Sequence, residues 1–463
     1  MSRTQGVAIE VRRRGLSESA RSGCKMISLD MGKKYFSVLG ACLLAASMWV
    51  WVQKIAIPHQ QAESAALGTP RGNLSDLYPR WLGARELLLH ARDPYGTDIT
   101  REIQTGYYGR PIDPTRPNDP KDQQAFAYPL YVVFVLAPTV RLPFPMVQRG
   151  FLWLLVMLTA GSIPLWLRAL GWRLSMSSRL VWILLTLGSF PAIQGFKLQQ
   201  LTVLVAALMA ASMSALAGGY FFCAGALLAL ASLKPQLVAL PIASLFIWAL
   251  GNWRERRPFV WGLGFTMIAM SGGSEFLLPG WISEFRSASA EYWRYTGGGR
   301  SVLDVELGPW LGRLVSAVLV AVLLYWAWRL RRVAVRTADF AWFVALMMAT
   351  TLAVIPMFAP YNQVLLVPAF MVAARTIGRQ WKAGRLSQFL LALTGISAFW
   401  PWLAALGLAV ALLFLPGTEV QKAWLAPLFT NFAIPTSTLA LLLVNQREMR
   451  EATPSSGQVI PAQ

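Results

Sequence analysis

Apolar runs of roughly 15 to 25 residues recur from about residue 35 to about residue 445, and short polar turns separate them. About 20 apolar residues cross the hydrocarbon core of a bilayer as a helix, so the pattern predicts an all-α polytopic membrane protein. We count about 11–13 predicted transmembrane helices. The range arises because LKPQ interrupts the run 220–250 and FWPW interrupts the run 386–415, so each run predicts either one kinked helix or two short ones.

The pattern divides the chain into a basic tail (1–34), a transmembrane domain (35–445) and a polar tail (446–463) that we expect to be disordered. Polar stretches at 58–126 and 281–308 predict two longer loops within the transmembrane domain.

The first apolar run, from about Tyr35 to Ile57, is longer than the core of a signal peptide and predicts an uncleaved signal anchor. The basic tail before it would then stay in the cytoplasm, and both long loops would be extracytoplasmic.

One stretch of the first loop, SDLYPRWLGARELLLHARDPYG, is periodic and charged. Leu77, Trp81, Ala84 and Leu88 recur at helical spacing and the charged residues occupy the other face, which predicts one amphipathic helix. We expect this helix to lie on the outer membrane face, with the apolar stripe dipping into the interface. Asx-Pro steps around it predict loop structure for the remainder of 58–126.

Composition supports the membrane class, because 55% of the 463 residues are hydrophobic and 14% are charged. The net charge of +20 lies in short basic clusters between apolar runs, which is typical of cytoplasmic anchors that contact membrane lipids. No basic domain with interleaved aromatic residues accompanies them, so we expect no nucleic-acid partner. The three cysteines are not spaced as a disulfide framework, and with only two histidines the chain offers few ligands for a metal site. We therefore expect no cofactor.

Asp76 stands immediately before the amphipathic helix, where an N-cap residue belongs. The carboxylate could cap the helix, or it could be a general base, because a helix N-terminus favours the ionised form that accepts a proton from a hydroxyl. The two roles are compatible.

Lys234, in LALASLKPQLVALP, is a cation within apolar sequence, which usually requires an anionic partner or a water-filled cavity. The alternative is a lysine that snorkels at the end of a short helix broken by Pro235. The stretch QGFKLQQL, with Lys197, Gln199 and Gln200, is a weaker pattern of the same kind.

The second loop, 281–308, contains five aromatic residues among charged ones. Such residues can stack on sugar rings, but an aromatic belt at the membrane interface is the more common cause.

Taken together, the helix opening with Asp76, the stretch ARELLLHARDPYG, the stretch FAYPLYVVFVLAP, a Gln-bearing helix start and the KPQ element resemble glycosyltransferase family 87. This family comprises GT-C type membrane enzymes that take sugars, typically mannose, from polyprenyl-phosphate carriers outside the cytoplasmic membrane. The resemblance runs from about Asp76 to Pro368.

The resemblance implies a GT-C type bundle, with Asp76 as the catalytic base and Lys234 as the lysine of the KPQ element. Arg80, Lys197 and Lys234 are the cations available for the donor phosphate, and Gln199 and Gln236 flank these lysines. Where the family usually has a histidine, APYNQVLLVP offers Tyr361 and Asn362.

The expected reaction moves a hexose from a polyprenyl-phosphate carrier to a lipid or glycan hydroxyl. A polyprenyl phosphate leaves without protonation, so one base suffices, and the outer loops contain no Asp-x-Asp pair. We therefore expect an inverting transfer without a metal. Two alternatives stay open, a transporter or lipid flippase and a catalytically degenerate assembly subunit. The acids are concentrated in the outer loops, which favours chemistry at that face.

Overall fold

The computed structural model describes residues 35–68, 74–113, 115–116, 118–120, 122–295 and 298–451. These residues form helices and no strand, which confirms the all-α class. The basic tail 1–34 and residues 452–463 lie outside the described residues. The helices are α2 (Ile57–Ala66), α3 (Leu77–His90), α4 (Thr97–Tyr108), α5 (Val132–Leu136), α6 (Phe144–Ala169), α7 (Met176–Leu187), α8 (Phe190–Leu198), α9 (Leu201–Ala217), α10 (Phe221–Leu230), α11 (Pro235–Leu250), α12 (Trp253–Leu277), α13 (Trp281–Tyr295), α14 (Val302–Leu307), α15 (Pro309–Arg329), α16 (Ala338–Val354), α17 (Val367–Lys382), α18 (Arg385–Ala411), α19 (Gly417–Gln421), α20 (Ala433–Val444) and α21 (Gln446–Arg450).

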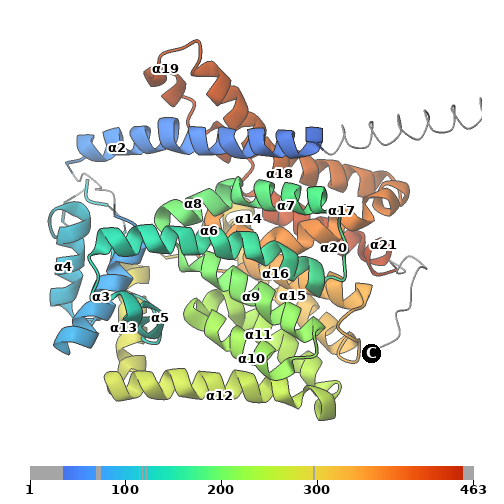
Figure 1. Ribbon diagram of the computed structural model, residues 1–463, viewed down its shortest axis with the longest axis horizontal. Coiled ribbons are helices and arrows are strands. Elements are labelled where there is room, and N and C mark those ends of the chain that lie inside the picture. Colours follow the sequence, from blue (N-terminus) through green and yellow to red (C-terminus); the bar gives the residue numbers. More distant parts are fainter. Residues whose placement is uncertain are drawn as a thin grey trace, which may run out of the picture.

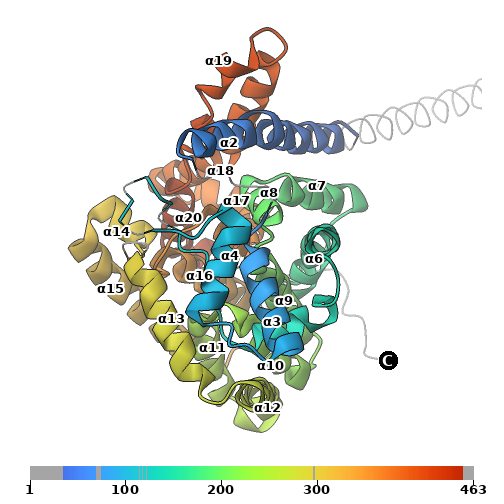
Figure 2. The same ribbon diagram turned by 90° about the vertical axis from the view of Figure 1, so that its left-hand side faces the viewer.

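The long helices run roughly along the long axis of the molecule. The helix Tyr35–Ala66, which ends with α2, crosses the upper part of Figure 1 beneath α19, and α12 runs along the bottom. The helices α3, α4 and α13 stand across this direction at one end, and Figure 2 views the molecule from that end. We call it the site end, because Asp76, Lys234 and Tyr361 lie there around one cavity.

Arginines join the turns at the opposite end, which we call the basic end. Their guanidinium groups donate to backbone carbonyls of neighbouring turns. These bonds tie the turns after α9, α11 and α15 together, and they tie the turn after α6 to α17. The contacts are Arg256 to Arg331 and Val333, Arg336 to Ala217 at 2.7 Å, and Arg375 to Leu170 at 2.9 Å. The basic clusters around Arg256, Arg336 and Arg375 therefore gather at one end of the described chain, as positive-inside anchors would.

Five helices of the described chain are long and apolar enough to cross a membrane, and a sixth span results if the bent pair α7 and α8 counts as one. The five are Tyr35–Ala66, Phe144–Ala169, Pro309–Arg329, Arg385–Ala411 and Gly417–Val444. Four shorter apolar helices of 10–17 residues accompany them. The chain is thus a multi-pass membrane protein. The expected number of 11–13 is larger because the sequence count also included these short helices, α12 and α17. It included as well the run 127–142, which forms only α5 and a 3₁₀ turn.

Both ambiguous runs are resolved by the structure. LKPQ separates α10 from α11, and the break lies at the site end, where Lys234 lines the cavity. FWPW does not break its helix, because α18 continues through Pro401 from Arg385 to Ala411.

Helices α10 and α12 pack at very close range through glycines. A Cβ atom on Gly225 would lie 2.0 Å from the carbonyl oxygen of Phe259, and one on Gly262 would lie 2.0 Å from that of Phe222. Small residues permit this approach of two backbones, which van der Waals packing rewards inside a membrane.

The expectation that the stripe on α3 enters the membrane interface is wrong. Leu77, Trp81 and Ala84 are at most 3% exposed and belong to the core, and the Trp81 indole donates to the Thr139 carbonyl at 3.3 Å. Since α3 is already covered by α5 and α6, its apolar face meets protein and not lipid. The periodicity was correct, but periodicity does not distinguish these two kinds of apolar surroundings.

The first loop contains more helix than the single one that the sequence predicted, because most of α2 and the whole of α4 lie within 58–126 in addition to α3. Arg92 joins α3 and α4 through salt bridges to Glu86 at 2.9 Å and to Glu102 at 2.6 Å. At the other end of the chain, residues 446–450 form α21, although we expected them in a disordered tail. Met449 is buried, and Arg450 pairs with Asp339 at 2.5 Å.

Candidate functional site

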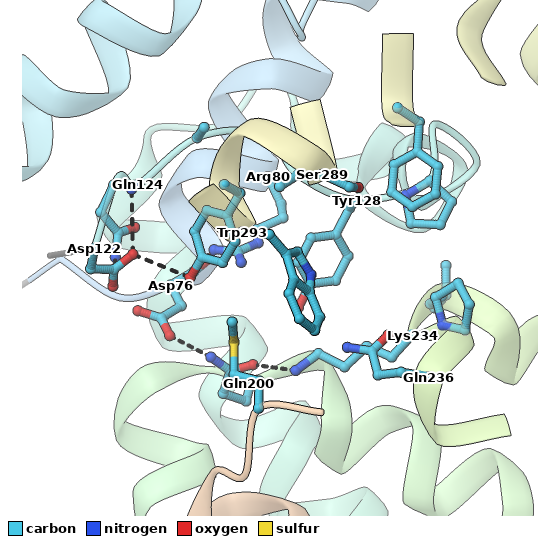
Figure 3. Close-up of a pocket in the computed structure, with 18 of the residues that line it drawn as sticks. Asp76, Arg80, Asp122, Gln124, Tyr128, Gln200, Lys234, Gln236, Ser289 and Trp293 are labelled. Carbon is cyan, nitrogen blue, oxygen red and sulfur yellow. Dashed lines mark hydrogen bonds between the residues drawn. The ribbon is translucent and has the colours of Figure 1, made fainter. Parts of the chain in front are cut away.

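A polar cavity of about 330 Å³ opens at the site end, under α13. Its walls come from the start of α3, the loop 122–129, the starts of α9 and α11, and the segment 356–361. Figure 3 shows Asp76, Arg80, Gln200 and Lys234 converging on this space from these different segments. The cavity thus joins elements that are far apart in the sequence, and it brings together the candidates Asp76, Arg80, Lys234, Gln236 and Tyr361.

Asp76 lies at the N-cap position of α3, but its side chain makes no cap hydrogen bond. The carboxylate instead accepts hydrogen bonds from the Gln200 amide and, at 3.4 Å, from the Tyr107 hydroxyl. Its backbone N–H donates to the Leu198 carbonyl at 3.0 Å, which fixes the start of α3 against the end of α8. The capping role is therefore wrong, and the carboxylate faces the cavity.

Gln200 links the carboxylate to the buried lysine. The Lys234 ammonium donates to Gln200 Oε1 at 2.7 Å, so the other end of the same amide, Nε2, faces Asp76. Figure 3 shows this chain of hydrogen bonds from Lys234 through Gln200 to Asp76. An ammonium group can only donate, and this fixes which way the amide points.

Lys234 is only 5% exposed. Its ammonium also donates to Thr202 Oγ1 at 2.8 Å and lies 4.9 Å from the centre of the Tyr361 ring. Burial of a cation costs free energy unless an opposite charge is near, and uncharged oxygens and ring faces offset that cost only in part. The nearest carboxylate on this chain of hydrogen bonds is Asp76, beyond Gln200, so an anion in contact with the ammonium would offset the cost further.

Arg80, one helical turn into α3, adds a second cation to the same wall. Its guanidinium lies 4.4 Å from the centre of the Tyr128 ring and donates to the backbone carbonyl of Asp76. These two contacts hold the group against the cavity that it lines.

A polar corner occupies the side of the cavity beyond Asp76, away from Lys234 (Figure 3). Gln124 Nε2 donates to Asp122 at 2.7 Å, and the Tyr292 hydroxyl donates to the same carboxylate at 3.4 Å. Burial, together with the neighbouring Asp122 charge, raises the pKa of the Tyr292 phenol well above its usual value, so the phenol keeps its proton. Trp293, the next residue on α13, projects over the middle of the cavity (Figure 3).

Backbone strain concentrates around the cavity. Among the described residues other than glycine, positive φ angles occur at Ala91, Gln124, Gln199 and Met357. Gln124 and Met357 line the cavity, and Gln199 directly precedes Gln200. Such conformations cost about 1–3 kcal/mol each and tend to cluster at functional sites.

Three predicted residues lie outside the cavity. Lys197 is bonded to Gln60 at 3.1 Å, on the exposed surface. Gln199 is 3% exposed, and its amide joins Ser75 to the Gln148 carbonyl. Asn362 stands behind the cavity wall and accepts from Thr202 at 2.9 Å, so it supports the group that holds Lys234.

Six cavity residues were not predicted as site residues, although Gln200 was noted in QGFKLQQL and Tyr292 and Trp293 were noted in the aromatic loop: Tyr128, Asp122, Gln124, Gln200, Tyr292 and Trp293. For Gln200, the pattern QGFKLQQL was recognised, but the left-handed turn at Gln199 makes the second glutamine, not the first, face Asp76. The aromatic residues of α13 were interpreted as an interface belt, because a sequence cannot show that α13 folds over a cavity.

No group of three or more histidine, cysteine, aspartate or glutamate side chains lies close enough to hold a metal ion within the part of the chain that the structure describes. The positive charges lining the cavity are Arg80 and Lys234.

Comparison with known proteins assigns the chain. None of the curated proteins matches it. The model of glycosyltransferase family 87 matches residues 126–356. The matched segment includes Gln200, Lys234 and Gln236, whereas Asp76 precedes it and Tyr361 follows it. With its apolar helices and this match, the chain belongs to glycosyltransferase family 87 and is a multi-pass membrane glycosyltransferase.

Proposed function

We propose that the protein moves a hexose, with mannose the first choice by family resemblance, from a polyprenyl-phosphate carrier to a hydroxyl of a lipid or glycan acceptor. The observation that carries this proposal is the single cavity in which a carboxylate, Asp76, and a buried cation, Lys234, are joined through one amide. A base and a phosphate-binding cation are the two groups that the reaction requires.

In this mechanism Asp76 takes the proton of the acceptor hydroxyl as its oxygen attacks C1 of the sugar. The bond between C1 and the phosphate oxygen breaks, and the polyprenyl phosphate leaves with the electron pair. Lys234 and Arg80 stabilise the negative charge of the leaving phosphate. A single displacement inverts the configuration at C1, and no acid is needed because phosphate leaves unprotonated. We propose that this transfer needs no metal ion.

A second, apolar cavity supports a lipid-linked donor. It measures about 430 Å³ and lies between α7, α8, α17, α18 and α20. The 3₁₀ segment Pro360–Leu366 contributes to both cavities, with Tyr361 in the polar one and Gln363 in the apolar one. A carrier whose phosphate lies at Lys234 would find an apolar chamber behind this short segment, where burial of each methylene contributes about 0.8 kcal/mol.

We further propose that the site end faces the outside of the cell membrane and that the tail 1–34 and the basic end face the cytoplasm. The arginine contacts of the basic end and the acids of the site end support this orientation. A donor delivered by a membrane lipid can be used on that side, where nucleotide sugars are not supplied.

The test supplies the purified protein with radiolabelled mannosyl- or glucosyl-phosphoryl polyprenol, or with the corresponding nucleotide sugar, in each case with and without a chelator. We expect transfer from one of the lipid-linked sugars, unchanged by the chelator and lost in the Asp76→Asn variant. Turnover of the nucleotide sugar alone, or loss of activity with the chelator, would overturn the proposal. Transport of the lipid-linked sugar across proteoliposomes without transfer would favour the flippase, and no activity in any arm would favour the assembly subunit.

A further inference from the structure

Gln200 has no role in the mechanism proposed above, although its amide joins the two groups that carry that mechanism. The residue is 3% exposed and lines the cavity between Asp76 and Lys234 (Figure 3). Its Oε1 accepts a hydrogen bond from the Lys234 ammonium at 2.7 Å, and its Nε2 donates to Asp76 Oδ2. Both ends of this buried amide are therefore bonded to groups of the proposed site.

The backbone around Gln200 fixes where this amide lies. The Gln200 N–H donates to the Gly195 carbonyl at 2.8 Å, and the Gln200 carbonyl accepts from the Val203 N–H at 3.1 Å. The Asp76 N–H donates to the Leu198 carbonyl at 3.0 Å, so Asp76 and Gln200 are both attached to the turn between α8 and α9. Although Gln200 is the N-cap residue of α9, its side chain makes no cap bond. One turn therefore sets the contact between the amide and the carboxylate.

The other end of the amide is fixed as well. The Lys234 ammonium also donates to Thr202 Oγ1 at 2.8 Å, and the Thr202 hydroxyl donates to Asn362 at 2.9 Å. Because an ammonium group can only donate, it binds the amide oxygen of Gln200 and turns the amide N–H groups toward Asp76. A hydrogen bond donated to a carboxylate favours its ionised form. Lys234 thus acts on Asp76 through Gln200.

The amide also separates the two charged groups. In a direct ion pair the carboxylate and the ammonium would bind each other, and both would have to part before they could bind their substrate groups. With the amide between them, the Asp76 carboxylate accepts a hydrogen bond from an uncharged group, and the ammonium stays at the cavity wall. This arrangement suits a base that must stay ionised and still accept a proton.

We propose that Gln200 is a positioning residue for the base: held by Lys234, its amide orients the Asp76 carboxylate toward the acceptor hydroxyl and keeps it ionised. The assignment rests on the proposed function, since it takes Asp76 to be the base. Gln200 acts on the reaction through Asp76, so its removal changes the protonation and the orientation of the base and leaves donor binding intact.

The first variant is Gln200→Met, which keeps the length of the side chain and removes both hydrogen bonds. Single-turnover transfer from the radiolabelled lipid-linked sugar is measured as a function of pH, because the acidic limb of this profile reports protonation of the base in the substrate complex. Loss of a hydrogen bond to the charged form raises the pH at which the carboxylate ionises, so the limb should move up by about one to two pH units. The rate above the limb should fall about tenfold through lost orientation. Donor affinity, measured by competition with polyprenyl phosphate, should stay within about threefold.

The second variant, Gln200→Glu, places another carboxylate between Asp76 and Lys234. Two carboxylates that share a site hold on to one proton, so the acidic limb should move up at least as far as in Gln200→Met. The new charge also pairs with Lys234, so this variant, unlike Gln200→Met, should weaken donor binding about tenfold. Neither variant alters the other charged or titratable groups that face Asp76 from the surrounding segments: Arg80, Tyr107, Asp122, Tyr128, Lys234, Tyr292 and Tyr361.

Gln380→Met is the matched control, because Gln380 is a fully buried glutamine of α17 that lines neither cavity. Its amide donates to the Ala373 carbonyl at 2.8 Å and to Thr376 Oγ1 at 2.7 Å. This variant should lower the melting temperature and leave the acidic limb in place. If the limb also stays in place in Gln200→Met and Gln200→Glu, Gln200 is a structural residue only and the proposal is overturned.

Failure of the proposed function would give a different result, because wild type would then show no transfer at any pH. In that case the contact is tested without turnover, by infrared spectroscopy. The difference between wild type and Asp76→Asn isolates the carbonyl band of protonated Asp76, and the same difference is taken in the Gln200→Met background. A titration of this band that moves to higher pH in Gln200→Met supports the positioning role, whereas an unmoved titration refutes it.

Discussion

Replacement of Asp76 by asparagine tests the proposed base with little disturbance of the structure. The two side chains have nearly the same shape, and the carboxylate makes no cap bond that the change could remove. Lys234 fixes the Gln200 amide with its N–H groups toward position 76. The asparagine oxygen would therefore accept from Gln200, and its amide nitrogen would donate to the Tyr107 oxygen.

The expected loss is catalytic. A general base contributes about 10²- to 10⁴-fold to a rate, which corresponds to about 2.7 to 5.5 kcal/mol of transition-state stabilisation. Because Asp76 contacts neither Lys234 nor the apolar cavity, donor affinity should change by less than about threefold. The variant should therefore lose kcat and keep its affinity for the donor.

Single-turnover transfer from radiolabelled donor, with polyprenyl-phosphate competition in parallel, measures the two quantities separately. Asp98→Asn is the matched control, because Asp98 is an exposed acid of α4 that pairs with Arg92, and exposed pairs contribute little. If Asp76→Asn retains activity within about tenfold of wild type, a loss of less than about 1.4 kcal/mol, Asp76 is not the base.

Further changes test the donor site, the helix packing and the orientation. Lys234→Met should weaken binding of the sugar donor about ten- to a hundredfold, because it removes a charged hydrogen-bonding group from the phosphate. An unchanged affinity in the competition assay would mean that Lys234 has only a structural role. Gly225→Ala should lower the melting temperature in detergent, because its Cβ would overlap the Phe259 carbonyl, whereas Gly264→Ala on α12 meets no atom within 4 Å and should leave it unchanged. Alkaline phosphatase fused near Asn118 should be active if the site end is extracytoplasmic, and activity of a cytoplasm-only reporter there would contradict that orientation.

The class of the protein was predictable from the sequence because it depends on local composition alone. The length of the apolar runs predicted most helices, such as α6 and α15. At LKPQ, one of the two alternatives that the sequence left open, a break between two short helices, is correct. The pattern could not decide between that break and a single span, because Pro235 is compatible with both a kink and a first helical turn. The number of membrane crossings was uncertain for the same reason.

The site was predictable only in part, because its residues meet through long-range packing. Asp76 and Lys234 were recognised since a carboxylate before a helix and a lysine in apolar sequence are locally unusual. Their connection was not, because it runs through Gln200, whose orientation depends on a left-handed turn at Gln199. Asp122 and Gln124 resemble ordinary loop residues until α13 closes over them.

The same long-range packing brings the starts of α3, α9 and α11 to one cavity, at Asp76, Gln200 and Lys234 respectively. The positive end of a helix dipole lies at its N-terminus, so three such ends contribute to a positive potential at this place. That potential favours the ionised form of a carboxylate and attracts a phosphate. The proposed reaction begins with an ionised base and a bound donor phosphate, so it requires both. The electrostatics of the site therefore arise from the direction of the helices as well as from Arg80 and Lys234. This is why breaks in apolar runs, such as the one at LKPQ, are useful to this enzyme: a continuous span would carry its N-terminus to the far end of the molecule.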